Sequence, residues 1–175
     1  AAAHSLRAVK NETLNKIIDL TNGPIHIHAA EQVKEVEEIK SFYKMPPVEF
    51  LFENFDINKR WCLIHCTQMS ELETELLSKS GAVAGLCPVT EANLGDGIFN
   101  GFQYNERKGL YGIGTDSNIN ISLTEELKTF EYSQRLLNKK RAVISNQKKS
   151  TGRKLFDDCL AVSYTHLRAH ETNQD

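Results

Sequence analysis

Two histidines share one side of a short apolar run. His26 and His28 alternate with Ile25 and Ile27. Successive side chains of a strand point to opposite faces, so both imidazoles lie on one face and both isoleucines on the other. An imidazole on an apolar face needs a polar partner. A metal ion is one such partner, and a hydrogen bond inside the protein core is another.

Two further polar side chains follow apolar runs. His65 ends the run 61–64, and Asp116 comes directly after the run 110–115. The carboxyl ends of parallel strands meet at one edge of an α/β fold, where such folds place their active sites. Imidazole and carboxylate together suit a borderline ion such as Zn²⁺, which acidifies a bound water. Asp116 could instead cap the turn that follows it.

The pattern along residues 9–144 predicts the elements that would hold these side chains. Short runs rich in apolar and β-branched residues predict strands, and apolar residues at helical spacing predict helices between them. The predicted strands are 25–28, 61–66, 82–87 and 110–115, with a possible fifth at 1–5, and the predicted helices include 14–20, 33–43, 72–77 and 125–137. This alternation indicates an α/β fold with a parallel sheet. A complete (β/α)₈ TIM barrel takes about 250 residues, so the chain corresponds to roughly half of one.

Residues 91–108 show little periodicity in their apolar residues, and residues 151–175 lie beyond the predicted strands and helices. Residues 91–108 are rich in Gly and Asn, and we expect a long loop there. We assign residues 1–150 to the partial barrel and 151–175 to a poorly defined tail, because 162–172 read like a translated sequencing adapter. His166 and His170 have the spacing of helical metal ligands. However, Leu167 stands where zinc proteases need Glu, so we expect no metal there.

Composition argues against several classes of partner. The 175 residues carry a formal net charge of -2, which offers no broad basic field for nucleic acid or an anionic membrane surface. No run approaches the roughly 18 apolar residues that cross a bilayer, and we expect a cytoplasmic protein. The four cysteines lack the paired spacing of a structural zinc site, so we predict reduced thiols.

Longer motifs give a more specific resemblance. Residues 87–97 read CPVTEANLGDG and residues 4–9 read HSLRAV, and the stretch 125–136 follows the aspartate. Together with His28-x-x-Glu31, His65 and Asp116, they resemble the amidohydrolase superfamily and, within it, the formimidoylglutamate deiminase family. The resemblance covers about residues 3–141. It implies the C-terminal half of a (β/α)₈ TIM-like barrel, about strands four to eight, in a chain truncated at both ends.

The resemblance also implies roles for the strand-end residues. His28 and Asp116 would be ligands of one Zn²⁺. Glu31 would carry protons, and His65 would orient or activate the attacking water. The family's first strand carries an H-x-H pair that supplies two further metal ligands. His26-Ile27-His28 resembles this pair, but Glu31 stands three residues after His28, as in the motif of the family's fifth strand. We therefore expect the H-x-H pair upstream of this chain. Asn118 departs from the pattern, which has His at that position.

The implied reaction is the hydrolytic deimination of a small molecule, N-formimidoyl-L-glutamate, to N-formyl-L-glutamate and ammonia. His4 and Arg7 match positions that hold the substrate's carboxylates, a task that suits the fixed fork of donors in Arg. Asp116 would take a proton from water, and Glu31 would protonate the departing nitrogen. We expect the chain alone to be inactive, with a homodimer as one option for the full-length protein.

Two other functions stay open. Within the superfamily, the chain could belong to a deaminase of an aminated ring, of the guanine or adenosine type, although the loop 90–97 and the pair His4 and Arg7 argue against it. From a different class, it could be a non-catalytic α/β binding module with structural polar groups at its strand ends. An apolar strand ending in H-x-H upstream of Ala1 would favour the enzyme.

Overall fold

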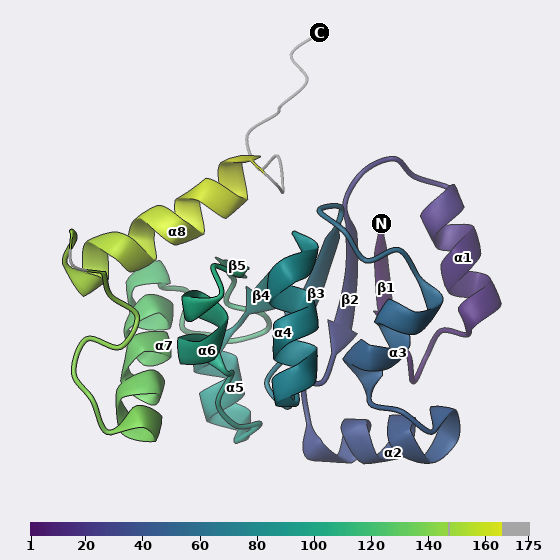
Figure 1. The fold of residues 1–175 in the computed structure, drawn as a ribbon, viewed down its shortest axis with the longest axis horizontal. Helices are drawn as coiled ribbons and strands as arrows, with labels where there is room; N and C mark the ends of the chain where they lie inside the picture. The colour runs from purple at the N-terminus through teal and green to yellow at the C-terminus, as the bar shows by residue number, and fades with distance from the viewer. Residues whose placement is uncertain (147, 166–175) are drawn as a thin grey trace, which may run out of the picture.

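Five parallel strands form one sheet in the order in which they occur along the chain (Figure 1). The computed structural model describes residues 1–146 and 148–165, with side chains described as far as Val162. The strands are β1 (Ala2–Ser5), β2 (Ile25–Ala29), β3 (Trp61–His65), β4 (Val83–Leu86) and β5 (Leu110–Ile113). The four predicted strands and the fifth at the start of the chain are therefore confirmed.

Helices connect the successive strands. They are α1 (Asn11–Asp19), α2 (Val33–Tyr43), α3 (Pro47–Asn54), α4 (Glu71–Ser80), α5 (Pro88–Leu94), α6 (Gly101–Glu106), α7 (Leu123–Asn138) and α8 (Thr151–Thr165). Each connection between neighbouring strands contains at least one helix, which is the pattern of successive βα units. The fold is a partial (β/α) barrel, as predicted. None of the described helices is both long and apolar enough to cross a membrane.

The two faces of the sheet differ in what covers them. The alternate residues Ile25, Ile27 and Ala29 of β2 are fully buried in the main core, which includes Leu14 of α1 and Ile39 of α2. The opposite, inner face carries aligned layers, because the strands pair in register. One layer, here termed the basal layer, consists of His26, Cys62, Val83 and Leu110. Burial, followed by the charge of the amino terminus, lowers the pKa of His26, which favours a neutral imidazole.

Helix α8 covers the basal layer. Val162 is buried and packs with Cys62 and Val83, against a partly buried Leu110. Val83 and Leu110 are the first residues of β4 and β5, so α8 lies at the amino ends of these strands. The expectation of a poorly defined tail is therefore wrong for the helical part, where Leu155 is also buried. The rest of the adapter-like segment, including both of its histidines, lies outside the described residues.

The region 91–108 is more ordered than expected. It contains the end of α5 and all of α6, and Phe99 and Tyr104 are buried in the core. Both helices are too short for a clear 3.6-residue pattern, which explains why the sequence predicted a loop. Pro88 starts α5 and Gly95 ends it at φ 73°, a left-handed conformation that Gly adopts at little cost. All four cysteines are buried and free in the structure.

Candidate active site at the carboxyl ends of the strands

The backbone turns sharply where β2 and β3 end and just beyond β5. Ala30, His65, Cys66 and Asp116 all have positive φ values, of 53°, 70°, 55° and 51°. Residues with a Cβ rarely adopt this region, and each such residue costs of order 1 kcal/mol or more. Strained residues of this kind persist where surrounding contacts hold them, and they concentrate at functional sites. Ala30 and Cys66 themselves belong to the hydrophobic core, and the three turns bring Glu31, His65 and Asp116 close together.

His65 lies at the centre of this cluster. Its ring is 1% exposed, and its Nδ1 lies 3.2 Å from Glu91 Oε1. Its Nε2 lies 3.8 Å from Glu31 Oε1 and 3.7 Å from Asp116 Oδ2. Burial alone would lower the pKa of His65, but the hydrogen bond to Glu91 and the charges of all three carboxylates outweigh burial and raise that pKa. The strand-end residues predicted from the sequence are thus brought together.

His28 is oriented for ligation through one ring nitrogen. Its Nδ1 lies 2.8 Å from the backbone oxygen of His4, and its ring centroid lies 5.5 Å from that of His65. A carbonyl oxygen only accepts, so the proton of this hydrogen bond belongs to Nδ1 and the lone pair of Nε2 is available. Ligating histidines commonly donate their other ring N–H to such an acceptor.

Asp116 complements His28 as a metal ligand. Its Oδ1 accepts from the backbone N–H of Ser117 at 2.6 Å, whereas its Oδ2 faces His65. A neutral imidazole nitrogen and a carboxylate oxygen are both donors that Zn²⁺ accepts. The residues present therefore fit two positions of a zinc site, and a four-coordinate ion would need further ligands.

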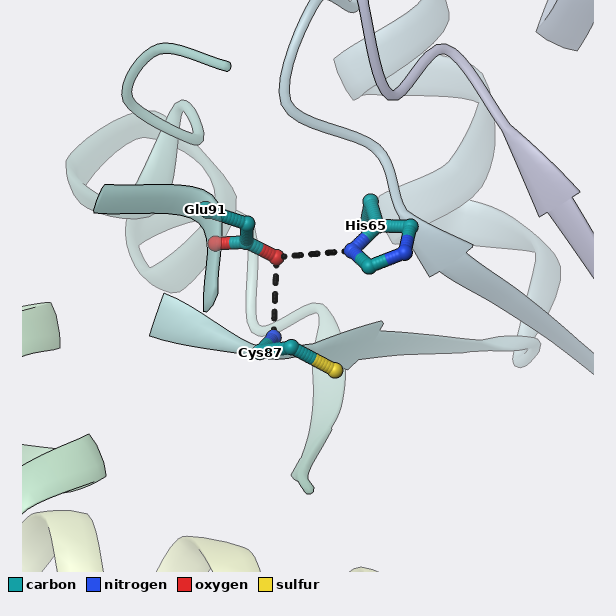
Figure 2. Close-up of side chains that lie close together, drawn as sticks. All are labelled: His65, Cys87 and Glu91. Atoms are coloured by element: carbon teal, nitrogen blue, oxygen red, sulfur yellow. Dashed lines mark hydrogen bonds and ion pairs between the residues drawn. The ribbon is translucent and has the colours of Figure 1, made fainter. Parts of the chain in front are cut away.

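A second group of side chains lies close enough together to hold a metal ion. It consists of His65, Cys87 and Glu91, whose potential ligand atoms lie within 4.8 Å of one another (Figure 2). Two observations favour a hydrogen-bonded cluster instead. Glu91 Oε1 already accepts from the backbone N–H of Cys87 at 2.8 Å and contacts His65. Burial, followed by the nearby carboxylates, raises the pKa of the Cys87 thiol, which disfavours the thiolate that metals bind.

Buried carboxylates that the sequence analysis did not identify support the cluster. Glu35 of α2 is 1% exposed and accepts from the backbone N–H groups of Ala30 at 3.1 Å and Glu31 at 2.7 Å. Glu126 of α7 is fully buried and accepts from the N–H of Val89 at 2.8 Å, which ties α7 to the start of α5. These carboxylates hold the turns from which the site residues project.

The two residues predicted to hold substrate carboxylates are placed differently. The His4 ring stacks on that of His28, with centroids 5.2 Å apart, so it borders the cluster. The Arg7 guanidinium is directed toward α2, where it lies 3.6 Å from Glu38. The side chains of Arg7 and Glu38 are 35% and 46% exposed. The structure therefore brings His4 to the cluster and leaves Arg7 in a surface ion pair.

The chain matches solved structures over most of its length. It superposes on an amidohydrolase from Brucella melitensis with a TM-score of 0.88 and 51% sequence identity, covering 90% of this chain and 36% of that one. A zinc-bound adenosine deaminase from Xanthomonas campestris gives a TM-score of 0.76 at 20% identity, which indicates a shared fold.

The chain also matches the sequences of curated deaminases. A formimidoylglutamate deiminase from Pseudomonas aeruginosa is 42% identical over 161 residues, which cover 90% of this chain and 36% of the relative. A 5-methylthioadenosine/S-adenosylhomocysteine deaminase from Pyrococcus furiosus is 31% identical over 72% of this chain. The chain thus spans about a third of the length of these curated relatives. The amidohydrolase family matches residues 1–150, and the chain belongs to this family.

Proposed function

We propose that this chain forms part of a zinc-dependent deaminase that hydrolyses N-formimidoyl-L-glutamate to N-formyl-L-glutamate and ammonia. One observation carries the proposal: the buried imidazole of His65 lies between the carboxylates of Glu31 and Asp116. The 42% identity to the Pseudomonas aeruginosa formimidoylglutamate deiminase over most of the chain supports the choice of substrate.

The proposed roles follow from position and chemistry. When bound, zinc supplies Lewis-acid activation of water. His28 and Asp116 would hold the ion, and Asp116 would also accept a proton from the attacking water. A C–O bond forms between the water and the amidine carbon, and the C–N bond to the departing nitrogen breaks. Both protons of the water end on this nitrogen, one by way of Asp116 and one carried by Glu31, so it leaves as ammonia. Each proton transfer of this kind typically contributes about 10²- to 10⁴-fold to the rate.

A chimeric enzyme tests this function. In it, residues 1–150 replace the matching segment of the Pseudomonas aeruginosa deiminase. We expect the chimera to release ammonia from N-formimidoyl-L-glutamate and Asp116→Asn to abolish that release. The 175-residue chain alone should bind zinc weakly and release no ammonia, because the described residues supply only two ligands. Stoichiometric zinc together with turnover in the chain alone would contradict this account.

Substitutions of Arg7 test whether the substrate carries a carboxylate. We propose that Arg7 leaves Glu38 and pairs with a substrate carboxylate when substrate is bound. Arg7→Ala in the chimera should then lower kcat/KM by about 10²-fold, since a bidentate charge-assisted pair contributes roughly 3 kcal/mol. Arg7→Lys should restore part of it. Glu38→Ala is the matched control, because it removes the same surface ion pair without removing the guanidinium. Near-normal kcat/KM in Arg7→Ala would argue against carboxylate recognition by this residue.

A ring deaminase is the second candidate. It is favoured by the sequence match to the Pyrococcus furiosus deaminase, which covers 72% of this chain. The same chimera distinguishes the two reactions when it is assayed with S-adenosylhomocysteine and with the linear amidine. Deamination of the nucleoside without release of ammonia from the amidine would favour the ring deaminase.

A further inference from the structure

Glu91 connects α5 to the central imidazole of the site. The residue is 4% exposed. Its Oε1 accepts from the backbone N–H of Cys87 at 2.8 Å and lies 3.2 Å from His65 Nδ1 (Figure 2). An ionised carboxylate only accepts hydrogen bonds, so the proton between Glu91 and His65 belongs to Nδ1. In this arrangement Nδ1 of His65 faces α5 and Nε2 faces Glu31 and Asp116.

Burial holds the His65 ring in place, but burial alone does not decide which ring nitrogen carries the proton. His65 stands at the end of β3 with a φ of 70°, outside the regular strand conformation. Its Nε2 lies 3.7 and 3.8 Å from Asp116 and Glu31, which is beyond direct hydrogen-bond length. Within the described part of the chain, Glu91 is the residue that the ring contacts at hydrogen-bond distance.

We propose that Glu91 is a positioning residue that holds His65 with Nδ1–H turned toward α5 and Nε2 turned toward the space between Glu31 and Asp116. This role rests on the proposed function, since that space is where the attacking water would lie. Groups that orient an imidazole through its second nitrogen commonly affect activity by about 10- to 100-fold when they are removed. Glu91 acts through His65 and need not touch the substrate.

The competing explanation is purely structural. Glu91 could serve only to fix the turn between β4 and α5 by accepting from Cys87. Glu126 provides a matched comparison, because it is also buried and also accepts from the start of α5, at the N–H of Val89. Glu126→Gln therefore perturbs the same helix start through a residue for which no contact with His65 is described.

The tautomer of His65 distinguishes the two explanations. The chain is labelled with ¹⁵N-histidine, and the ring nitrogens are measured by NMR at a pH where the imidazole is neutral. We expect Nδ1–H in the wild type and a shift toward Nε2–H in Glu91→Leu. Glu91→Gln, which keeps an acceptor oxygen and nearly the same shape, should shift the ring less, and Glu126→Gln should leave the ring as it is in the wild type.

Kinetics in the chimera complete the test. Glu91→Leu should lower kcat by about 10- to 100-fold with little change in KM, because in this proposal Glu91 acts through His65 and does not hold the substrate. An unchanged tautomer in Glu91→Leu, or an equal shift in Glu126→Gln, would overturn the positioning role. If the tautomer shifts as expected but the wild-type chimera deaminates no substrate, the proposed function fails and the positioning of His65 by Glu91 stands.

Discussion

Replacing Glu35 with alanine removes the carboxylate that holds the turn after β2. Glu35 accepts from the backbone N–H groups of Ala30 and Glu31 at 3.1 and 2.7 Å. Ala30 is fully buried at a φ of 53°, so its N–H cannot find water after the substitution. Glu31 keeps an 18% exposed side chain, and its N–H can be rehydrated more easily. The two lost hydrogen bonds are therefore unequal in cost.

The structure gives a magnitude for this change. A buried donor left without an acceptor costs about 1 to 3 kcal/mol, and hydrogen bonds to charged groups contribute about 1.5 to 3 kcal/mol. Assigning roughly 2 kcal/mol to Ala30 and about 1 kcal/mol to Glu31 gives a loss near 3 kcal/mol. For a chain of this size, that corresponds to a fall in Tm of roughly 6 to 12 °C. Glu35→Gln should lose less, because its amide oxygen still accepts.

Urea unfolding followed by circular dichroism measures the difference. Glu38→Ala is the control on the same helix, since its carboxylate is 46% exposed and its ion pairs with Arg7 and Lys34 are long, at 3.6 and 3.9 Å. Exposed pairs of this kind contribute about 0 to 1 kcal/mol. The reasoning is refuted if Glu35→Ala and Glu38→Ala lower the free energy of unfolding by the same amount.

Three further predictions concern other parts of the molecule. Val162→Ala should lower the free energy of unfolding by about 1 to 2 kcal/mol in urea, because it removes buried packing. Leu160→Ala, at a 46% exposed position, should lower it much less, and equal losses would contradict the burial of Val162. In the chimera, Asp116→Asn should weaken zinc binding at least about 10-fold in a chelator competition, and unchanged affinity would remove Asp116 as a ligand. Burial raises the pKa of Glu126, so its contribution to stability is present at low pH and is lost as the pH rises through the folded-state pKa. Glu126→Gln should therefore gain stability relative to the wild type as the pH rises above about 4.3, the ordinary pKa of Glu, and a difference that stays constant with pH would contradict the raised pKa.

The sequence identified the strand-end residues because their signal is local. An apolar run that stops at a polar residue predicts both the strand and its carboxyl end, which located His28, His65 and Asp116 correctly at the ends of the sheet. Strand alternation likewise predicted that His26 and His28 share the inner face. These patterns depend on neighbours in the chain, so no tertiary information was needed.

The supporting residues could not be predicted in the same way. Glu35 lies in one acidic helix with Glu37 and Glu38, and only tertiary contacts make the first buried and leave the other two exposed. Glu91 stands in a distinctive motif, but its contact with His65 joins two different βα units. The direction of the Arg7 guanidinium is equally invisible, because a long side chain near the surface can reach several partners.

The prediction of a poorly defined tail was wrong for α8 for a different reason. Leu155, Cys159 and Val162 recur at intervals of four and three residues, which is the spacing of one helix face. The adapter-like pattern concerns residues 162–172, but the prediction of a poorly defined tail covered all of 151–175, although the first half of this segment has the helical spacing. A doubtful origin for part of a segment is therefore a poor guide to the structure of the rest.

The packing of α8 on the basal layer also affects how the protein can be shortened. The family match ends at residue 150, directly before α8 begins at Thr151. Trimming the gene at that point would uncover Cys62, Val83 and Leu110 on the inner face. Newly exposed apolar surface of this kind promotes self-association and binds hydrophobic dyes. The shortest unit that keeps the basal layer covered is therefore longer than the segment that matches the family, because it retains α8 at least as far as Val162.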